Sequence, residues 1–200
     1  RSSGNVRWPA QDAVLDPSLY PSTVREYLKP SKAINADHSL VQKVAREIIS
    51  TVPVEHRRSE TTVAKAVYEW IVRNIRYDLM KNYPGDSTCG NWQTTFGGWG
   101  RNFDEWCYTA DEVIKQGRAI CIEFERLACA LLRALHIPAR PAPLGAHPVT
   151  QWWVQLPDGS GYWSNFESSR GSSEYRRTGD LSARFPAVPD SAITFWSPDA

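Results

Sequence analysis

The sequence predicts an α+β domain in which helices come first, a cysteine-bearing helix lies in the middle and antiparallel strands follow. Apolar residues recur at three- and four-residue intervals over 37–51, 63–71 and 121–135, the spacing of buried helical faces. Short stretches rich in tryptophan and valine come after them, separated by turn residues. Two hundred residues suit one domain with a substantial core, and the length also allows two small domains.

The first 36 residues are rich in proline and show little periodicity, so we expect an extended arm wrapped over a domain formed by residues 37–200. The chain does not begin with Met, and residues 1–4 resemble an internal or processed start. We therefore expect that the chain can be part of a larger, multidomain protein. The prolines of the arm are Pro9, Pro17, Pro21 and Pro30.

Two helices are expected before residue 80. The first covers 37–51, and Pro53 ends it. The second carries the apolar face over 63–71. The candidate capping residues are Asp37 or Ser39 for the first helix and Thr61 or Thr62 for the second.

A long loop is predicted between Pro84 and Gly100, because five glycines in this stretch break any regular element. Cys89 and Cys107 flank part of this loop. A disulfide between them would stabilise the fold by about 3 kcal/mol in the chain-entropy model and would imply an oxidising, extracytoplasmic compartment. Two free thiols are the alternative, and the geometry decides between them.

Cys121 follows a loop ending in 117–120 and opens the amphipathic helix over 121–135. In the first turn, its thiolate would interact with the positive end of the helix dipole and with unpaired backbone N–H groups, which favour ionisation and nucleophilicity. A buried structural cysteine is the alternative reading of a single Cys on a helix.

The segments after Pro138 predict a small antiparallel sheet. A strand is expected over 139–144, a second over 151–156 and a third over 161–166. Between the last two strands, the residues 157–159 read Pro-Asp-Gly, a turn sequence, so these strands should form a hairpin.

Four segments in one order resemble the transglutaminase-like superfamily. They cover roughly residues 60 to 170 and are 66–78, 109–121, 130–140 and 152–163. The resemblance implies a papain-like or transglutaminase-like core, with the helix of the nucleophile Cys121 packed against an antiparallel sheet. It also implies acyl transfer at amide bonds, in which the thiol is paired with a histidine that a carboxylate or amide orients.

The resemblance places the histidine in the pattern His-x-Trp-Val, and here that position falls on Gln151, which cannot act as a base. His147 lies four residues earlier. Either the loop brings His147 to Cys121, or the site has lost its base. The family's carboxylate position falls on Glu167, and Asn165 lies two residues earlier on the same face of the strand.

Composition excludes several functions. A net charge of +1 with 22% charged residues gives no basic surface for nucleic acid. No apolar run of about eighteen residues predicts a membrane span. The cysteines and histidines show no metal-binding spacing and no glycine-rich phosphate loop is recognisable, so we expect no metal and no cofactor.

Two functions remain open besides a purely structural module. The first is a cysteine enzyme, a peptidase or amidase if water accepts the acyl group and a transglutaminase if an amine does. The second is a degenerate domain that binds peptide or glycan through a tryptophan-rich groove, to which Trp92, Trp99, Trp106 and Trp152 would contribute. The expected partner is a peptide, protein or peptidoglycan-like substrate.

Overall fold

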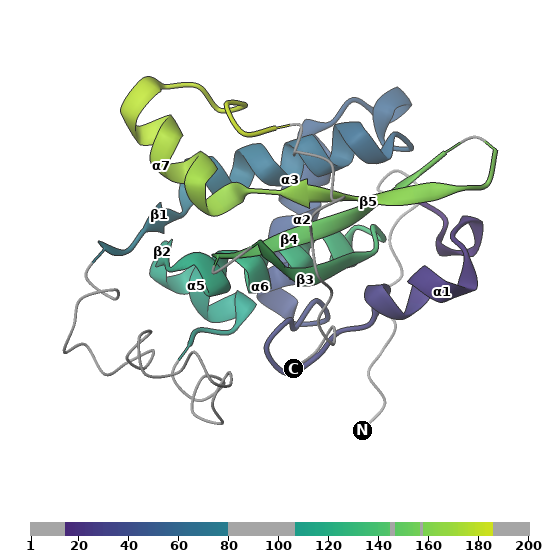
Figure 1. Cartoon of the computed structure of the whole chain (residues 1–200), viewed down its shortest axis with the longest axis horizontal. Coiled ribbons are helices and arrows are strands. Elements are labelled where there is room, and N and C mark those ends of the chain that lie inside the picture. The colour runs from purple at the N-terminus through teal and green to yellow at the C-terminus, as the bar shows by residue number, and fades with distance from the viewer. Residues whose placement is uncertain (1–14, 80–106, 145–146, 157, 186–200) are drawn as a thin grey trace.

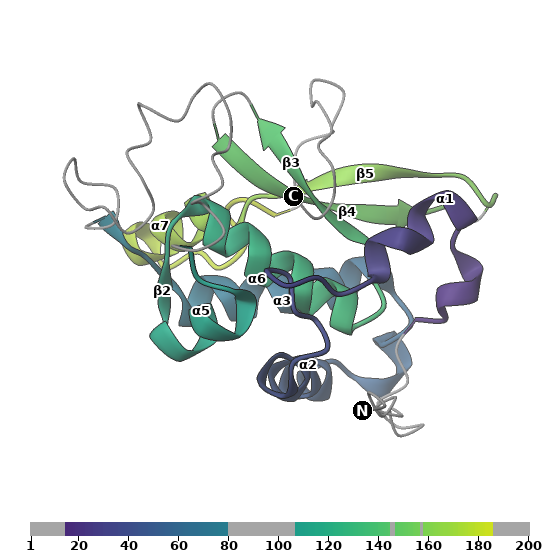
Figure 2. The same cartoon turned by 90° about the horizontal axis from the view of Figure 1, so that it is seen from below.

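The computed structural model describes residues 15–79, 107–144, 147–156 and 158–185. A three-stranded antiparallel sheet lies on a layer of helices, with β4 (His147–Gln155) between β3 (Ala139–Leu144) and β5 (Gly161–Phe166) (Figure 1). The view from below shows the sheet on one side of α6, and α2 and α3 on the other side of the molecule (Figure 2). The predicted α+β fold class is confirmed.

Helix α6 (Cys121–Ala134) is the centre of the core. Thirteen of its residues are buried, because the helix packs against the sheet on one side and against neighbouring helices on the other. These neighbours are α2 (Ser39–Thr51), α3 (Glu60–Asn74), α5 (Ala110–Gln116) and α7 (Ser168–Thr178). The predicted helix at Cys121 is therefore confirmed.

The capping residues of α2 and α3 differ from those predicted. His38 caps α2, since its Nδ1 accepts a hydrogen bond from the Leu40 N–H at 3.2 Å. Ser59 caps α3, since its hydroxyl accepts from the Thr62 N–H. The cap of α2 differs because a His imidazole also offers an acceptor nitrogen, and α3 begins earlier than predicted because Ser59 lies before both candidate threonines.

The predicted hairpin is confirmed, with Trp153 opposite Trp163 and Thr150 opposite Phe166. Strand β4 begins earlier than predicted, at His147 rather than near residue 151. A proline inside a strand normally removes a ladder hydrogen bond. Here Pro148 stands opposite Pro143 on the edge strand β3, so neither position has an N–H to pair and the strand continues through both.

A second, two-stranded parallel sheet joins β1 (Arg76–Tyr77) to β2 (Arg118–Ala119), with Tyr77 opposite Ala119. Strand β2 leads directly into α6, and Gly117 before it has φ 66°, a left-handed conformation that ends α5. This pairing brings Tyr77 to the start of α6.

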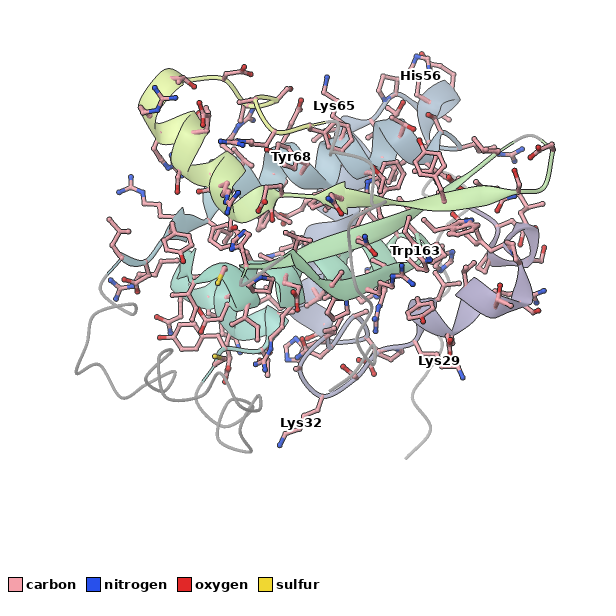
Figure 3. All side chains as sticks on the ribbon, viewed as in Figure 1. Lys29, Lys32, His56, Lys65, Tyr68 and Trp163 are labelled. Carbon is pink, nitrogen blue, oxygen red and sulfur yellow. The ribbon has the colours of Figure 1, made fainter. Side chains whose placement is uncertain are left out.

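The described part of the N-terminal arm is not simply extended. Residues 15–36 contain α1 (Ser22–Arg25), which lies between the 3-10 turns Pro17–Leu19 and Glu26–Leu28. Outside the arm, a further 3-10 turn, Val54–His56, links α2 to α3. Tyr20 and Val24 pack against Trp163 of β5, which is labelled in Figure 3. Within residues 15–28, these short helical turns contact the sheet through Tyr20 and Val24.

Candidate active site

Cys121 is the first residue of α6, directly after Ile120. The entry to the helix is fixed by Glu123, which is fully buried. Its two carboxylate oxygens accept from the Ile120 N–H and the Tyr108 N–H, both at 2.9 Å. This pair of bonds ties the preceding loop to the helix and sets the position of the half-buried Cys121 side chain.

The surroundings of the thiol do not match the expected activation. Burial raises the pKa of Cys121 to about 11, and the negative charge of Glu125 acts in the same direction. Hydrogen bonds from the Tyr77 side chain and from the backbone of Ile122 lower this pKa, but by less. The ring of Tyr77 stacks on Phe124, with 6.1 Å between ring centroids. At neutral pH the resting group is therefore a thiol.

His147 and Glu167 form a close pair. The Nε2 atom of His147 lies 2.8 Å from Oε1 of Glu167, and the two side chains are 18% and 12% exposed. Ser169, at the start of α7, lies 3.3 Å from the same Glu167 oxygen and 3.4 Å from His147 Nε2. Because Nε2 bonds the carboxylate, Nδ1 is the ring nitrogen available to a reacting group.

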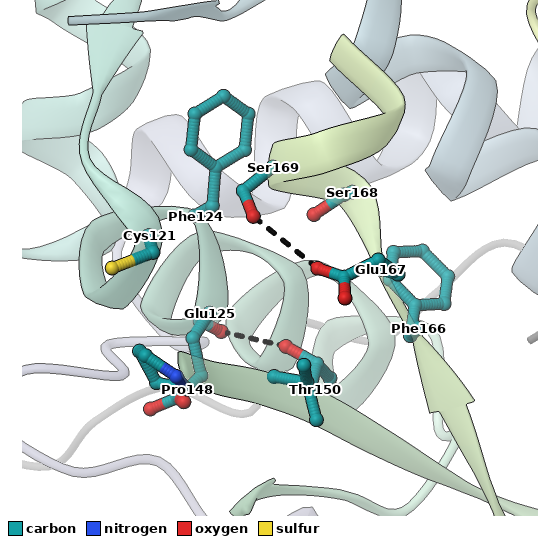
Figure 4. Close-up of a pocket in the computed structure, with 10 residues that line it drawn as sticks. Cys121, Phe124, Glu125, Pro148, Thr150, Phe166, Glu167, Ser168 and Ser169 are labelled. Carbon is teal, nitrogen blue, oxygen red and sulfur yellow. Dashed lines mark hydrogen bonds between the residues drawn. The ribbon is translucent and has the colours of Figure 1, made fainter. Parts of the chain in front are cut away.

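The pair lies at the same end of α6 as the cysteine. One small pocket is lined by Cys121 and Glu167 together with Pro148, the residue next to His147 (Figure 4). In that view the sulfur of Cys121 points away from Glu167. The hydrogen bond that lowers the thiol pKa comes from the Tyr77 side chain of β1. The structure thus brings the imidazole and its carboxylate together, while the thiol is turned toward β1.

Gln151, the residue at the family's histidine position, is fully buried. Its neighbour Thr150 donates to the Glu125 backbone carbonyl of α6, whereas the Gln151 side chain contacts residues of β3 and β5. There its Oε1 accepts from Arg140 at 3.0 and 2.9 Å, and its Nε2 donates to Asn165 at 3.2 Å. Gln151 and Asn165 therefore belong to a buried network behind the sheet rather than to the surroundings of Cys121.

Trp152 was predicted to contribute to a groove, and the structure places it in the core instead. It is 3% exposed and belongs to the hydrophobic core, where it stacks on Phe185. Trp92, Trp99 and Trp106 lie outside the described residues. Cys89 does too, so the disulfide with the buried Cys107 stays a prediction.

Three side chains near Cys121 were not singled out by the sequence. Tyr77 belongs to the segment that resembles the family, but its contact with the thiol depends on the parallel pairing of β1 with β2. Ser169 is brought in by α7, for which no prediction was made. Glu125 lies one helical turn after Cys121, a spacing that signals a shared face.

No group of three or more metal-binding side chains occurs within the described ranges. Likewise, none of the helices in those ranges is both long and apolar enough to cross a membrane.

The fold and this cluster define a class of protein. A cysteine at the start of a central helix, packed on an antiparallel sheet that carries a histidine and a carboxylate, is the papain-like arrangement. The model of the transglutaminase-like superfamily matches residues 42–168, more than half of the chain. The chain belongs to the transglutaminase-like superfamily.

A crystal structure from Cytophaga hutchinsonii, of a protein provisionally named a cysteine protease, is similar in fold, with a TM-score of 0.50 and 20% sequence identity. The match covers 75% of this chain and 43% of that one, so the chain spans less than half of its solved relative. No curated protein matches the sequence.

Proposed function

We propose that the protein is a cysteine-dependent enzyme of acyl transfer that acts on amide bonds. The observation that carries this proposal is the 2.8 Å pair of His147 and Glu167 beside the pocket that Cys121 lines. A half-buried histidine held by a carboxylate, together with a thiol at a helix start, is the set of groups that nucleophilic catalysis requires.

In the proposed reaction, the Cys121 sulfur attacks the amide carbonyl carbon and forms a tetrahedral oxyanion. Backbone N–H groups at the start of α6 are unpaired within the helix and would stabilise this charge. His147 accepts the thiol proton through Nδ1 and passes it to the leaving amine, whose departure leaves a thioester on Cys121. Water or a second amine then attacks the thioester, which restores the thiol.

Glu167 holds the ring and stabilises the imidazolium that forms in this step. Ser169 supports the geometry, since its hydroxyl lies within 3.4 Å of both groups. Because the resting Cys121 is a thiol, proton transfer to His147 has to accompany the attack, and the side chain has to rotate from Tyr77 toward the imidazole.

The substrate that we propose is a peptide, protein or peptidoglycan-like amide in an extracytoplasmic location. The solved relative from Cytophaga hutchinsonii is named as a protease, and hydrolysis and transfer differ only in the group that accepts the acyl chain.

A specific observation favours a second candidate function. The raised thiol pKa and the turn of the sulfur toward Tyr77 also fit a degenerate domain that binds peptide or glycan without turnover. This candidate needs no contact between Cys121 and His147.

The two candidates are separated by turnover measurements. Hydrolysis is followed with dye-labelled casein, and transfer is followed as incorporation of dansylcadaverine into casein. Enzyme activity should be lost in Cys121→Ser and in His147→Ala and kept in His56→Ala, a matched change at an exposed histidine. Activity that is unchanged in Cys121→Ser would refute the proposed enzyme.

A further inference from the structure

Two arginines lie opposite each other in the small parallel sheet that leads to the thiol. Arg76 of β1 is the ladder partner of Arg118 of β2, and both side chains are exposed. The next residues of the two strands, Tyr77 and Ala119, pack against the core, as alternation along a strand requires. Like charges at neighbouring positions of a sheet repel each other, so this pair does not stabilise the ladder.

Two further arginines extend this positive surface. Arg73 is exposed in the last turn of α3, and the guanidinium of Arg176 on α7 donates to the Arg73 carbonyl at 2.7 Å. One turn earlier on α7, Ser172 donates to the Ile75 carbonyl, so α7 lies along the chain that enters β1. Figure 1 shows β1, β2 and α7 at one end of the molecule, and Figure 2 again shows β2 and α7 at the same end. We call this set the arginine cluster: Arg73, Arg76, Arg118 and Arg176.

Acidic side chains neutralise only part of the arginine cluster. Asp78 lies 3.8 Å from Arg118, and its side chain is 13% exposed. Glu174, the acid on α7, already bonds Arg177. The other three arginines of the cluster form no ion pair with residues in the described ranges. The cluster therefore keeps a net positive charge at the surface.

Guanidinium groups in this arrangement suit carboxylates. Each group offers a planar fork of N–H donors that can pair with a carboxylate through two hydrogen bonds. Neighbouring strands lie about 4.8 Å apart, and carboxylates on alternate residues of an extended peptide lie about 7 Å apart. Both spacings are within the span of long arginine side chains, so an acidic peptide can contact several of them at once.

A short acidic segment fits the arginine cluster better than a nucleic acid does. The whole chain carries a net charge of +1, so the residues outside the four arginines carry a net negative charge and would repel a long polyanion. Proteins that bind single-stranded nucleic acid stack its bases on exposed aromatic rings. Here the ring of Tyr77 stacks on Phe124. The ring of Tyr175 has the Arg176 guanidinium over it, 5.2 Å from the centroid.

We propose that the arginine cluster is a docking surface for an acidic segment of a partner protein. Strand β2 leads directly into α6, so a protein held at this surface has part of its chain beside Cys121. This role goes beyond acyl transfer, because binding at the cluster needs neither His147 nor the thiol. It also gives a reason for a like-charge pair that the sheet itself does not need.

The test measures the fluorescence anisotropy of labelled probes at low salt. The probes are a short peptide of alternating Glu and Ser, the matching peptide of Gln and Ser, and an oligothymidylate of the same length. The cluster variant combines Arg76→Gln with Arg118→Gln. The control variant combines Arg58→Gln with Lys32→Gln, which removes two exposed positive charges elsewhere on the surface.

The parent should bind the acidic peptide more tightly than the neutral peptide and the oligothymidylate. The affinity should fall as salt rises, because exposed charges are screened. The cluster variant should bind the acidic peptide about 3- to 30-fold more weakly, the range for the loss of two exposed charge contacts. The control variant should keep the parent affinity.

Equal binding of the acidic peptide by the parent and the cluster variant would overturn the docking surface, and so would an equal loss in the control variant. A parent that binds either of the other probes as tightly would overturn it too. The thermal midpoint checks the fold of each variant, and if the cluster variant does not fold, the comparison of probes on the parent decides. Cys121-dependent turnover without peptide binding would refute the docking surface alone, and peptide binding without turnover would refute only the proposed enzyme.

Discussion

Replacing Glu167 by Gln keeps the size of the side chain and removes the negative charge that faces His147. The hydrogen bond between them is 2.8 Å long and both side chains are mostly buried, so solvent screening is limited. A hydrogen bond to a charged group contributes about 1.5 to 3 kcal/mol, which corresponds to a rate loss of about 10- to 150-fold if the bond is fully used when the imidazolium forms. The second ion pair of Glu167, with the half-exposed Arg170 at 3.9 Å, adds little.

The assay for this change is the rate of acetylation of Cys121 by p-nitrophenyl acetate, measured as nitrophenolate release and mapped by mass spectrometry. Glu174→Gln is the matched control, because Glu174 bonds Arg177 at the surface of the same helix. The thermal midpoint is measured for each protein, so that a loss of folded protein is not mistaken for a loss of rate. A change below about twofold in folded Glu167→Gln would refute the role of this carboxylate.

Three further predictions concern residues around the site. Glu125→Gln should raise the thermal midpoint at about pH 7 and not at about pH 4. Burial raises the pKa of Glu125 in the folded protein, so the stability of the parent falls as pH rises above the unfolded-state pKa of about 4.3. Equal shifts of the thermal midpoint at both pH values in calorimetry would contradict this. Gly171→Ala should cost about 1 to 3 kcal/mol of unfolding free energy, because a Cβ there would collide with the Tyr68 hydroxyl, and a denaturant midpoint equal to that of the parent would exclude this close contact. Gln151→His should not increase acetylation of Cys121, because this side chain faces away from α6; a rate gain would show that the sheet face is misassigned.

Local patterns predicted much of the fold. The amphipathic spacing after Cys121 gave the central helix, and the Pro-Asp-Gly turn gave the β4–β5 hairpin, since both depend on contacts between residues close in sequence. The start of β4 was missed because a proline such as Pro148 normally indicates a loop. In the structure its partner across the ladder, Pro143, is also a proline. That pairing depends on strand register.

The site was harder to predict than the fold. Counting along the strand led to Gln151, and one residue of difference in the alternation turns a side chain to the other face of the sheet. The contact of His147 with Glu167 depends on where β4 begins and β5 ends, and the contact of Tyr77 with the thiol depends on a parallel pairing. The burial that raises the thiol pKa is a property of the packed core and has no local signal in the sequence.

The central claim, that His147 is the base for Cys121, is tested most directly by the acylation step itself. The parent and His147→Ala are mixed with p-nitrophenyl acetate, and the single-turnover rate and the site of acetylation are measured, with His56→Ala as the control. The account predicts one acetyl group on Cys121 and a rate at least about 100-fold lower in folded His147→Ala, the usual contribution of a general base. Acetylation of Cys121 at the same rate in both proteins would contradict it.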